Sequence, residues 1–212
     1  MCHFQLKQDQ LTLEALNYYN VFDEVPLTGS ITYAELAKRC RIPETRLRRF
    51  IQHAMSNRIF WAPTPNSVAH TITSAEVVRS PFLYAWLGHN VEEIGPGCTK
   101  VIEAMKQWGD SEDPTEAGFP LAFNLKGENL FQFFESDGVG EASAVNGKVD
   151  KFDRTKGWRA RRFGNAMKFM MSHGVSASKH VHGGFDWESL GEATVVDVSS
   201  TLGQTYLLEA PH

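Results

Sequence analysis

The sequence predicts a mainly α-helical fold with a winged helix-turn-helix near the N-terminus and a single strand near the C-terminus. Three observations support this prediction. Apolar residues recur at helical spacing over most of the chain, a turn with two prolines at residues 63–66 separates two runs of strand-forming residues, and a β-branched run occurs at residues 193–198. We expect three regions, at residues 1–80, 81–190 and 191–212.

Composition narrows the class of protein before any motif is considered. The 212 residues, of which 42% are hydrophobic and 22% charged, suffice to bury a sizeable core. No run approaches the roughly 18 apolar residues that a membrane-spanning helix needs. The N-terminus also lacks the pattern of a signal or transit peptide, so we expect a cytoplasmic protein with no membrane partner. Cys2, Cys40 and Cys98 are widely and irregularly spaced, which predicts reduced thiols.

The first 80 residues predict helices followed by a hairpin. A helix is expected over residues 11–19, and Thr32 with Glu35 predicts a capping box at the start of a second helix. A third helix begins near Pro43, where proline suits a first turn. Two short strands are then expected on either side of the turn at residues 63–66. This order of elements is typical of a winged helix.

Helical patterns resume after the hairpin. Residues 74–108 predict three helices, with breaks at Ser80-Pro81 and at Gly95-Pro96-Gly97, because proline and glycine interrupt backbone hydrogen bonding. The polar, glycine-bearing stretch 136–149 predicts a loop. Residues 157–172 predict a further helix, which completes a compact helical body.

Several ordered segments of the chain carry a family resemblance. They include Asn20-Val21-Phe22-Asp23, Ser56-Asn57-Arg58-Ile59-Phe60, Ala85-Trp86-Leu87-Gly88-His89-Asn90, Arg161-Arg162-Phe163-Gly164-Asn165 and Val195-Val196-Asp197-Val198. Together they resemble the fungal O-methyltransferases that depend on S-adenosylmethionine. Each segment alone is a weak signal, but their number and order make the resemblance specific, and it covers nearly all of the chain.

The resemblance implies a helical, winged-helix dimerisation region followed by the first strand of a Rossmann-like domain that binds S-adenosylmethionine. It places Asp197 and Gly203 in the first cofactor-binding motif, where one glycine stands in place of the two or three that let a backbone approach the cofactor closely. The positions that bind the cofactor ribose and supply the catalytic histidine in such enzymes are absent. We therefore expect a truncated, non-methylating protein without a cofactor, although S-adenosylmethionine serves the full-length family.

Candidate site residues gather on two of the predicted helices. His89 is the first catalytic candidate, because imidazole can donate a hydrogen bond to a carbonyl group and imidazolium can polarise one. Arg162 is the second, since a guanidinium group binds carboxylates and polarised carbonyls through parallel hydrogen bonds. The resemblance implies a substrate-binding surface of Phe163, Met167 and Met170, and Trp86 and Asn90 are further substrate-binding candidates because they stand beside His89. Periodicity alone would make most of these residues part of the core.

Two other kinds of site have weaker support. Six basic residues on or beside the second helix of the predicted winged helix are compatible with DNA binding: Lys38, Arg39, Arg41, Arg46, Arg48 and Arg49. A net charge of −4, however, gives no wide basic surface, so we expect no nucleic-acid partner. The three histidines at positions 173, 180 and 182 match no recognised ligand spacing, so we expect no metal.

The sequence leaves three hypotheses for function. The leading one is a homodimeric protein of fungal secondary metabolism that binds a polyketide-like natural-product intermediate. In this hypothesis the protein promotes cyclisation or isomerisation of the intermediate, as a pericyclase does, without a cofactor. The second hypothesis is an O-methyltransferase fragment or splice product, inactive or active only in a heterodimer with a full-length methyltransferase. The third is a regulatory winged-helix or dimerisation module.

Overall fold

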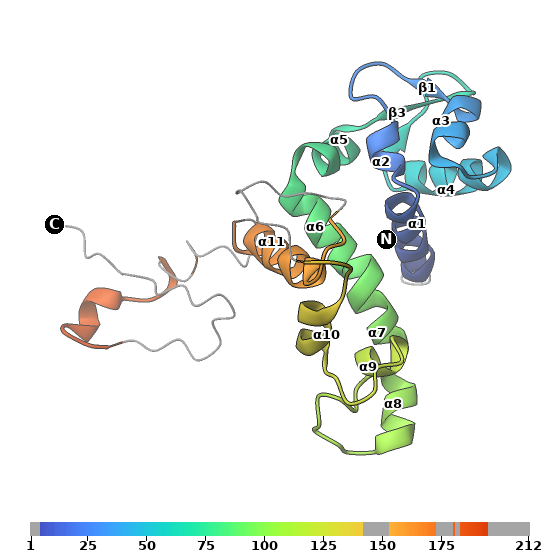
Figure 1. The fold of residues 1–212 in the computed structure, drawn as a ribbon. Helices are drawn as coiled ribbons and strands as arrows, with labels where there is room; N and C mark the ends of the chain where they lie inside the picture. Colours follow the sequence, from blue (N-terminus) through green and yellow to red (C-terminus); the bar gives the residue numbers. More distant parts are fainter. Residues whose placement is uncertain (1–4, 142–152, 173–179, 181–182, 195–212) are drawn as a thin grey trace.

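The computed structural model describes residues 5–141, 153–172, 180 and 183–194, and most of them are helical (Figure 1). The N-terminal elements are α1 (Leu6–Tyr18), α2 (Val21–Glu24), β1 (Ile31–Thr32), α3 (Tyr33–Cys40), α4 (Glu44–Ser56), β2 (Phe60–Trp61), β3 (Ser67–His70) and α5 (Ile72–Arg79). They are followed by α6 (Pro81–His89), the π-helical turn η2 (Asn90–Ile94), α7 (Gly95–Thr99), α8 (Val101–Trp108), α9 (Gly118–Ala122), α10 (Leu130–Ser136), α11 (Trp158–Ser172) and the 3₁₀ turn η4 (Trp187–Leu190). The prediction of a mainly helical fold is confirmed.

A small antiparallel sheet with strand order β1-β3-β2 lies in the N-terminal region. Phe60 of β2 lies opposite His70 of β3, and Ile31 of β1 lies opposite Val68. The two strands predicted around residues 63–66 are confirmed. The sequence did not predict β1, because two residues of extended chain leave no alternation of apolar and polar residues to detect.

Helix α3 begins at its predicted cap, but only half of the capping box forms. The side-chain oxygen of Thr32 accepts a hydrogen bond from the backbone N–H of Glu35 at 3.3 Å. The Glu35 carboxylate accepts instead from Nε of Arg39 at 3.0 Å, since an opposite charge four residues later competes for it. The predicted return bond from Glu35 to the cap is therefore wrong.

The N-terminal helices and the sheet enclose one apolar core. Its largest fully buried side chains are Leu16, Phe22, Leu36, Leu47, Ile51, Phe60 and Val68. Each such side chain contributes about 1.5–3 kcal/mol by leaving water. This core fixes α1 and α4, and through α5 it fixes the start of the helical column that carries the site.

The predicted break at Ser80 is confirmed, whereas the one at Pro96 is wrong. Ser80 caps α6 by accepting from the backbone N–H of Leu83 at 3.2 Å, and Pro81 occupies the first turn. At Gly95-Pro96-Gly97 the helical path continues, because the π turn η2 changes the hydrogen-bond register and Pro96 falls in the first turn of α7. A first-turn proline loses no helical hydrogen bond, so the column runs on without a break.

Helix α11 packs along α6, which brings two distant parts of the chain together at the centre of the molecule (Figure 1). Helix α10 in turn contacts α11. The predicted helix at residues 157–172 is confirmed. Residues 195–198 of the predicted terminal strand and residues 142–149 of the predicted loop lie outside the described residues.

Two further expectations concern the cysteines and the membrane. Among the described residues, Cys40 is a buried free thiol and Cys98 an exposed one. In the same part of the chain, every helix is too short or too polar to cross a membrane.

Candidate functional site

His89 lies at the C-terminal end of α6 and is buried, with 6% of its side chain exposed. Its Nδ1 lies 2.5 Å from Oε2 of Glu93, which follows four residues later in η2 and shares the same helical face. A carboxylate can only accept, so Nδ1 carries the proton of this bond. Nε2 of His89 has no hydrogen-bond partner among the residues that the structure describes.

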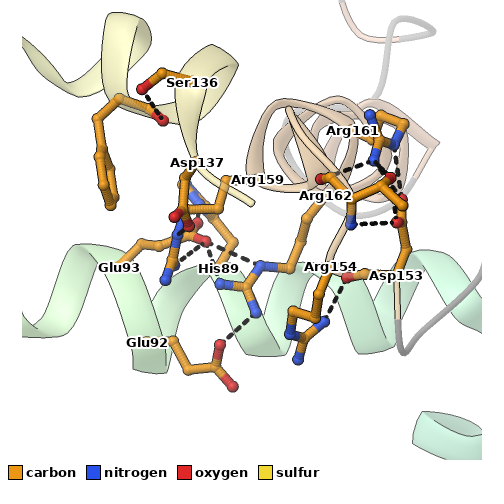
Figure 2. Close-up of polar contacts among 12 residues, drawn as sticks. His89, Glu92, Glu93, Ser136, Asp137, Asp153, Arg154, Arg159, Arg161 and Arg162 are labelled. Atoms are coloured by element: carbon orange, nitrogen blue, oxygen red, sulfur yellow. Dashed lines mark hydrogen bonds and ion pairs between the residues drawn. The ribbon is translucent and has the colours of Figure 1, made fainter. Parts of the chain in front are cut away.

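Glu93 is fully buried and is shared by three cationic or donor side chains (Figure 2). Its Oε1 accepts from Nη1 of Arg159 at 2.9 Å and from Nε of Arg162 at 3.0 Å, and Nη2 of Arg162 also contacts it. Burial by itself raises the pKa of Glu93, but the hydrogen bond from His89 and the charge of Arg162 outweigh it and leave the pKa below its usual value of 4.5. Glu93 is therefore ionised at neutral pH.

Further carboxylates extend this network to other helices. Nη1 of Arg162 donates to Glu92 at 2.5 Å, and the amide of Asn17 on α1 also donates to Glu92. Nε of Arg159 donates to Asp137, which follows α10, at 2.5 Å. Three carboxylates thus face two guanidinium groups in this network. We call His89, Glu93, Arg159 and Arg162 the His89 site.

Aromatic rings surround the imidazole of His89. Its ring centroid lies 5.2 Å from that of Phe163 on α11 and 5.9 Å from that of Phe134 on α10, in both cases edge to face. Phe163 also contacts Phe131, which is 55% exposed. The guanidinium groups of the site lie over the ring of Trp158, at 4.3 Å for Arg159 and 4.5 Å for Arg162. Aromatic rings thus contact both the imidazole and the two guanidinium groups.

The structure brings together part of the predicted site. His89, Arg162 and Phe163 are neighbours, as the sequence analysis expected. Trp86 packs against Phe169 with centroids 5.9 Å apart, and the Asn90 side chain donates to the backbone oxygen of Trp86 at 2.8 Å. The Asn90 amide therefore satisfies a helical carbonyl group.

The remaining predicted residues are less directly placed. Met167 is partly buried on α11, and Met170 is 36% exposed there. The roles of these methionines in binding stay predictions. Asp197 and Gly203, predicted to belong to a cofactor motif, lie outside the described residues.

Sequence reasoning did not single out Glu93 or Arg159. Glu93 carried a usable signal, since it follows His89 by four residues in a helical segment and a carboxylate at that spacing reaches an imidazole. Arg159 lies close to Arg161 and Arg162 in the sequence, and nothing local distinguishes it from them. Its part in the site depends on the packing of α11 against α6, which no local pattern encodes.

The basic helix α4 uses one of its arginines internally. Arg48 donates to Glu44 at 2.8 Å and lies over the ring of Tyr33 at 4.1 Å, so its guanidinium group is engaged within the N-terminal region. Arg46 and Arg49 are exposed.

Among the described residues, no group of three His, Cys, Asp or Glu side chains is arranged to hold a metal ion.

Known structures share this arrangement of helices. OxaC, in a crystal structure with sinefungin and meleagrin, superposes with a TM-score of 0.61 and 18% identity, over 88% of this chain and 42% of OxaC. A pericyclic reaction enzyme superposes with a TM-score of 0.54 and 14% identity, over 77% of this chain and 38% of that protein. At these identities the likeness shows a shared fold and nothing more.

Sequence comparison then gives the family. O-methyltransferase VdtC of Byssochlamys spectabilis is 31% identical over 92% of this chain and 41% of its own length, and O-methyltransferase bik3 of Gibberella fujikuroi is 30% identical over 91% and 38%. Chlorophenol O-methyltransferase of Trichoderma longibrachiatum is 33% identical over 73% of the chain and 33% of its own length. No family model matches the chain. The chain belongs to the fungal O-methyltransferases and spans between about a third and two fifths of the length of these relatives.

Proposed function

We propose that this chain supplies the acceptor-binding part of an O-methyltransferase-like protein of fungal secondary metabolism, and that the His89 site binds a flat, polyketide-like small molecule. One observation carries the proposal. His89 is buried among aromatic rings, its Nδ1 is held by Glu93, and its Nε2 has no hydrogen-bond partner within the described residues. A ring nitrogen without a partner at such a position is suited to a polar group of a bound molecule.

The surroundings of His89 favour an aromatic ligand. Phe131 and Phe163 offer ring faces and edges beside the imidazole, and such rings bind flat molecules by offset stacking or edge-to-face contact. Met167 and Met170 lie on the same helix as Phe163 and can follow the shape of a ligand. The name of one relative, chlorophenol O-methyltransferase, supports a ring that carries a hydroxyl group.

The proposed chemistry at His89 begins with a hydrogen bond. With its proton on Nδ1, neutral His89 offers the Nε2 lone pair to a hydroxyl proton, as a general base does when an oxygen atom attacks a methyl donor. In a methyl transfer, S-adenosylmethionine would supply the methyl group. The activities of the relatives support this reading for a protein that contains the whole family fold.

A second candidate function is cyclisation or isomerisation of the bound molecule without methyl transfer. It is favoured by the shared fold with a pericyclic reaction enzyme. In this reading the protein restricts the shape of the substrate, and protonated His89 donates to a developing negative charge. Arg162 would be the second donor, although its guanidinium already contacts Glu92 and Glu93, so the charge it offers a ligand is partly neutralised.

We further propose that the N-terminal helices and the β1-β3-β2 sheet serve as a winged-helix dimerisation region. The order of α3, α4, β2 and β3 supports the winged helix. Exposed apolar side chains on α1, at Leu6 and Leu11, support a second chain packed against it. That chain would be another copy of this protein or a full-length methyltransferase.

The proposal is tested by titrating the 212-residue protein with 1-naphthol, a flat ring with one hydroxyl group, and following tryptophan fluorescence. His89→Ala should weaken binding about fivefold, the size of one net hydrogen bond. Phe163→Ala should weaken it further by removing ring contact, while Phe185→Ala, at an exposed ring in the C-terminal segment, is the control. Equal affinity of all four proteins would refute the site.

The two chemistries are separated by a second measurement. Incubation of 1-naphthol with S-adenosylmethionine and the protein is followed by mass spectrometry. A product heavier by CH₂, as expected when a methyl group replaces the hydroxyl proton, assigns the chain to methyl transfer. Binding of 1-naphthol without that product favours the cofactor-independent reading.

A further inference from the structure

We propose that Glu93 is a positioning residue that holds the proton of His89 on Nδ1, so that the site presents an acceptor at Nε2 and selects ligands that donate a hydrogen bond. This inference deepens the proposed function and rests on it for the part that concerns ligands. The part that concerns the proton on His89 stands on the described contacts alone.

The orientation of the Glu93 carboxylate is set by the arginines. Arg159 and Arg162 both donate to Oε1, and guanidinium groups have no acceptor, so this oxygen is committed to them. Oε2 is left to His89 at 2.5 Å. The ring of Trp158 also contacts both guanidinium groups, which helps to hold their positions. The carboxylate is thus held on both oxygens.

The consequence for His89 follows from donor and acceptor rules. Neutral imidazole carries one proton, and an ionised carboxylate requires that proton on Nδ1. Nε2 then offers a lone pair, which binds a hydroxyl group as donor and repels the lone pairs of a carbonyl group. Glu93 thereby sets which class of ligand His89 favours, without contacting the ligand itself.

Replacing Glu93 by glutamine should reverse this preference. The arginines accept nothing, so the amide oxygen must occupy the place of Oε1, and the NH₂ group then points at His89. An NH₂ group needs an acceptor, which forces the lone pair onto Nδ1 and the proton onto Nε2. A similar change of carboxylate to amide beside a histidine is known to impose the wrong tautomer in serine proteases.

The first experiment is a long-range ¹H–¹⁵N NMR spectrum of the histidine-labelled protein at pH 8, with His89 assigned by its loss in His89→Ala. Wild type should carry the proton on Nδ1, and Glu93→Gln on Nε2. Glu92→Gln is the matched control, because it removes the neighbouring carboxylate, which binds Arg162 and Asn17 but not His89. It should keep the wild-type tautomer. A wild-type proton on Nε2, or an unchanged tautomer in Glu93→Gln, overturns the proposal.

Loss of the network in Glu93→Gln could prevent folding, so a second variant is included. Glu93→Asp keeps the charge but shortens the side chain by one methylene group, which withdraws the acceptor from Nδ1. Its His89 should populate both tautomers. A pure Nδ1–H form in this variant would mean that something other than Glu93 fixes the proton, and would overturn the proposal.

The second experiment compares 1-naphthol, a hydroxyl donor, with 1-tetralone, a carbonyl acceptor of nearly the same shape. Wild type and Glu92→Gln should bind 1-naphthol more tightly. Glu93→Gln should lose about fivefold for 1-naphthol and gain a similar factor for 1-tetralone. Parallel losses for both ligands would show that Glu93 acts only on stability and would overturn the selectivity. If wild type binds neither ligand while the tautomers behave as expected, the proposed function fails and the positioning of His89 by Glu93 stands.

Discussion

Replacing Arg162 by methionine tests the internal ion network most directly. The Arg162 side chain is 11% exposed and binds Glu93, which is fully buried, as well as Glu92. Methionine keeps much of the length of the side chain and its apolar contact with Trp158, but it removes the charge. Glu93 would then keep Arg159 and His89 as its only partners among the described residues, and Glu92 would lose a charged one.

The expected magnitude follows from the burial of the carboxylate. Removing one partner of a buried ion pair costs about 3–5 kcal/mol, because the other charge stays desolvated. Arg159 still compensates Glu93, so we place the loss at the lower end, about 3 kcal/mol. With a urea dependence of about 2–3 kcal/mol per molar, the midpoint of unfolding should fall by roughly 1 M.

The assay is urea unfolding followed by circular dichroism for wild type, Arg162→Met and a surface control. Arg39→Met is that control, since its pair with Glu35 has side chains that are 47% exposed and such pairs contribute about 0–1 kcal/mol. The double variant Arg162→Met with Glu93→Gln should recover part of the loss, because the uncompensated charge is gone. Equal midpoints for the Arg162 and Arg39 variants would refute the reasoning.

Three further predictions concern pH and packing. The pKa of Glu93 is lowered in the folded state, so the stability that the ionised carboxylate contributes is present above pH 4.5 and is lost as the pH falls through the folded pKa. The melting temperature of Glu93→Gln should therefore fall less steeply than that of wild type as the pH is lowered in this range. An equally steep fall in both proteins would contradict the prediction. Burial, together with the negative charge of Glu24, raises the pKa of the Cys40 thiol from 9.0 to about 12. The stability that the neutral thiol contributes is therefore complete below pH 9 and is lost between pH 9 and 12. The melting temperature of Cys40→Ala should depend less on pH in that range than the melting temperature of wild type. A methyl group at Gly88 would lie 2.9 Å from Nη1 of Arg162, so Gly88→Ala should displace this guanidinium group and lower the free energy of unfolding. In the Arg162→Met background, the same substitution should lower the free energy of unfolding by less than it does in wild type.

Local patterns in the sequence predicted most of the N-terminal region. Thr32 and Ser80 mark the starts of helices α3 and α6. Their signal is local, because the side-chain hydroxyl of a capping residue accepts a hydrogen bond from a backbone N–H only three residues later. Leu47 and Ile51 are spaced in the sequence so that they share one helical face, and both are buried in α4. The sequence could not tell that the chain stays helical through Pro96, since the π turn before it leaves no compositional mark.

For the candidate site, too, the sequence predicted the local features, and the packing of the helices decided the rest. By itself, the sequence determined the family segments, the helix that contains His89, and the Phe163 and Arg162 positions on a second helix, because each is a local property of a few consecutive residues. Only the tertiary structure decided that Oε1 of Glu93 accepts hydrogen bonds from Arg159 and Arg162 while Oε2 accepts from His89. It also decided that the Arg162 guanidinium binds carboxylates within the protein. These contacts join residues 66 and 69 positions apart and arise because α11 packs along α6. The physical reason is that a buried charge must find its partners in space, wherever in the chain they lie.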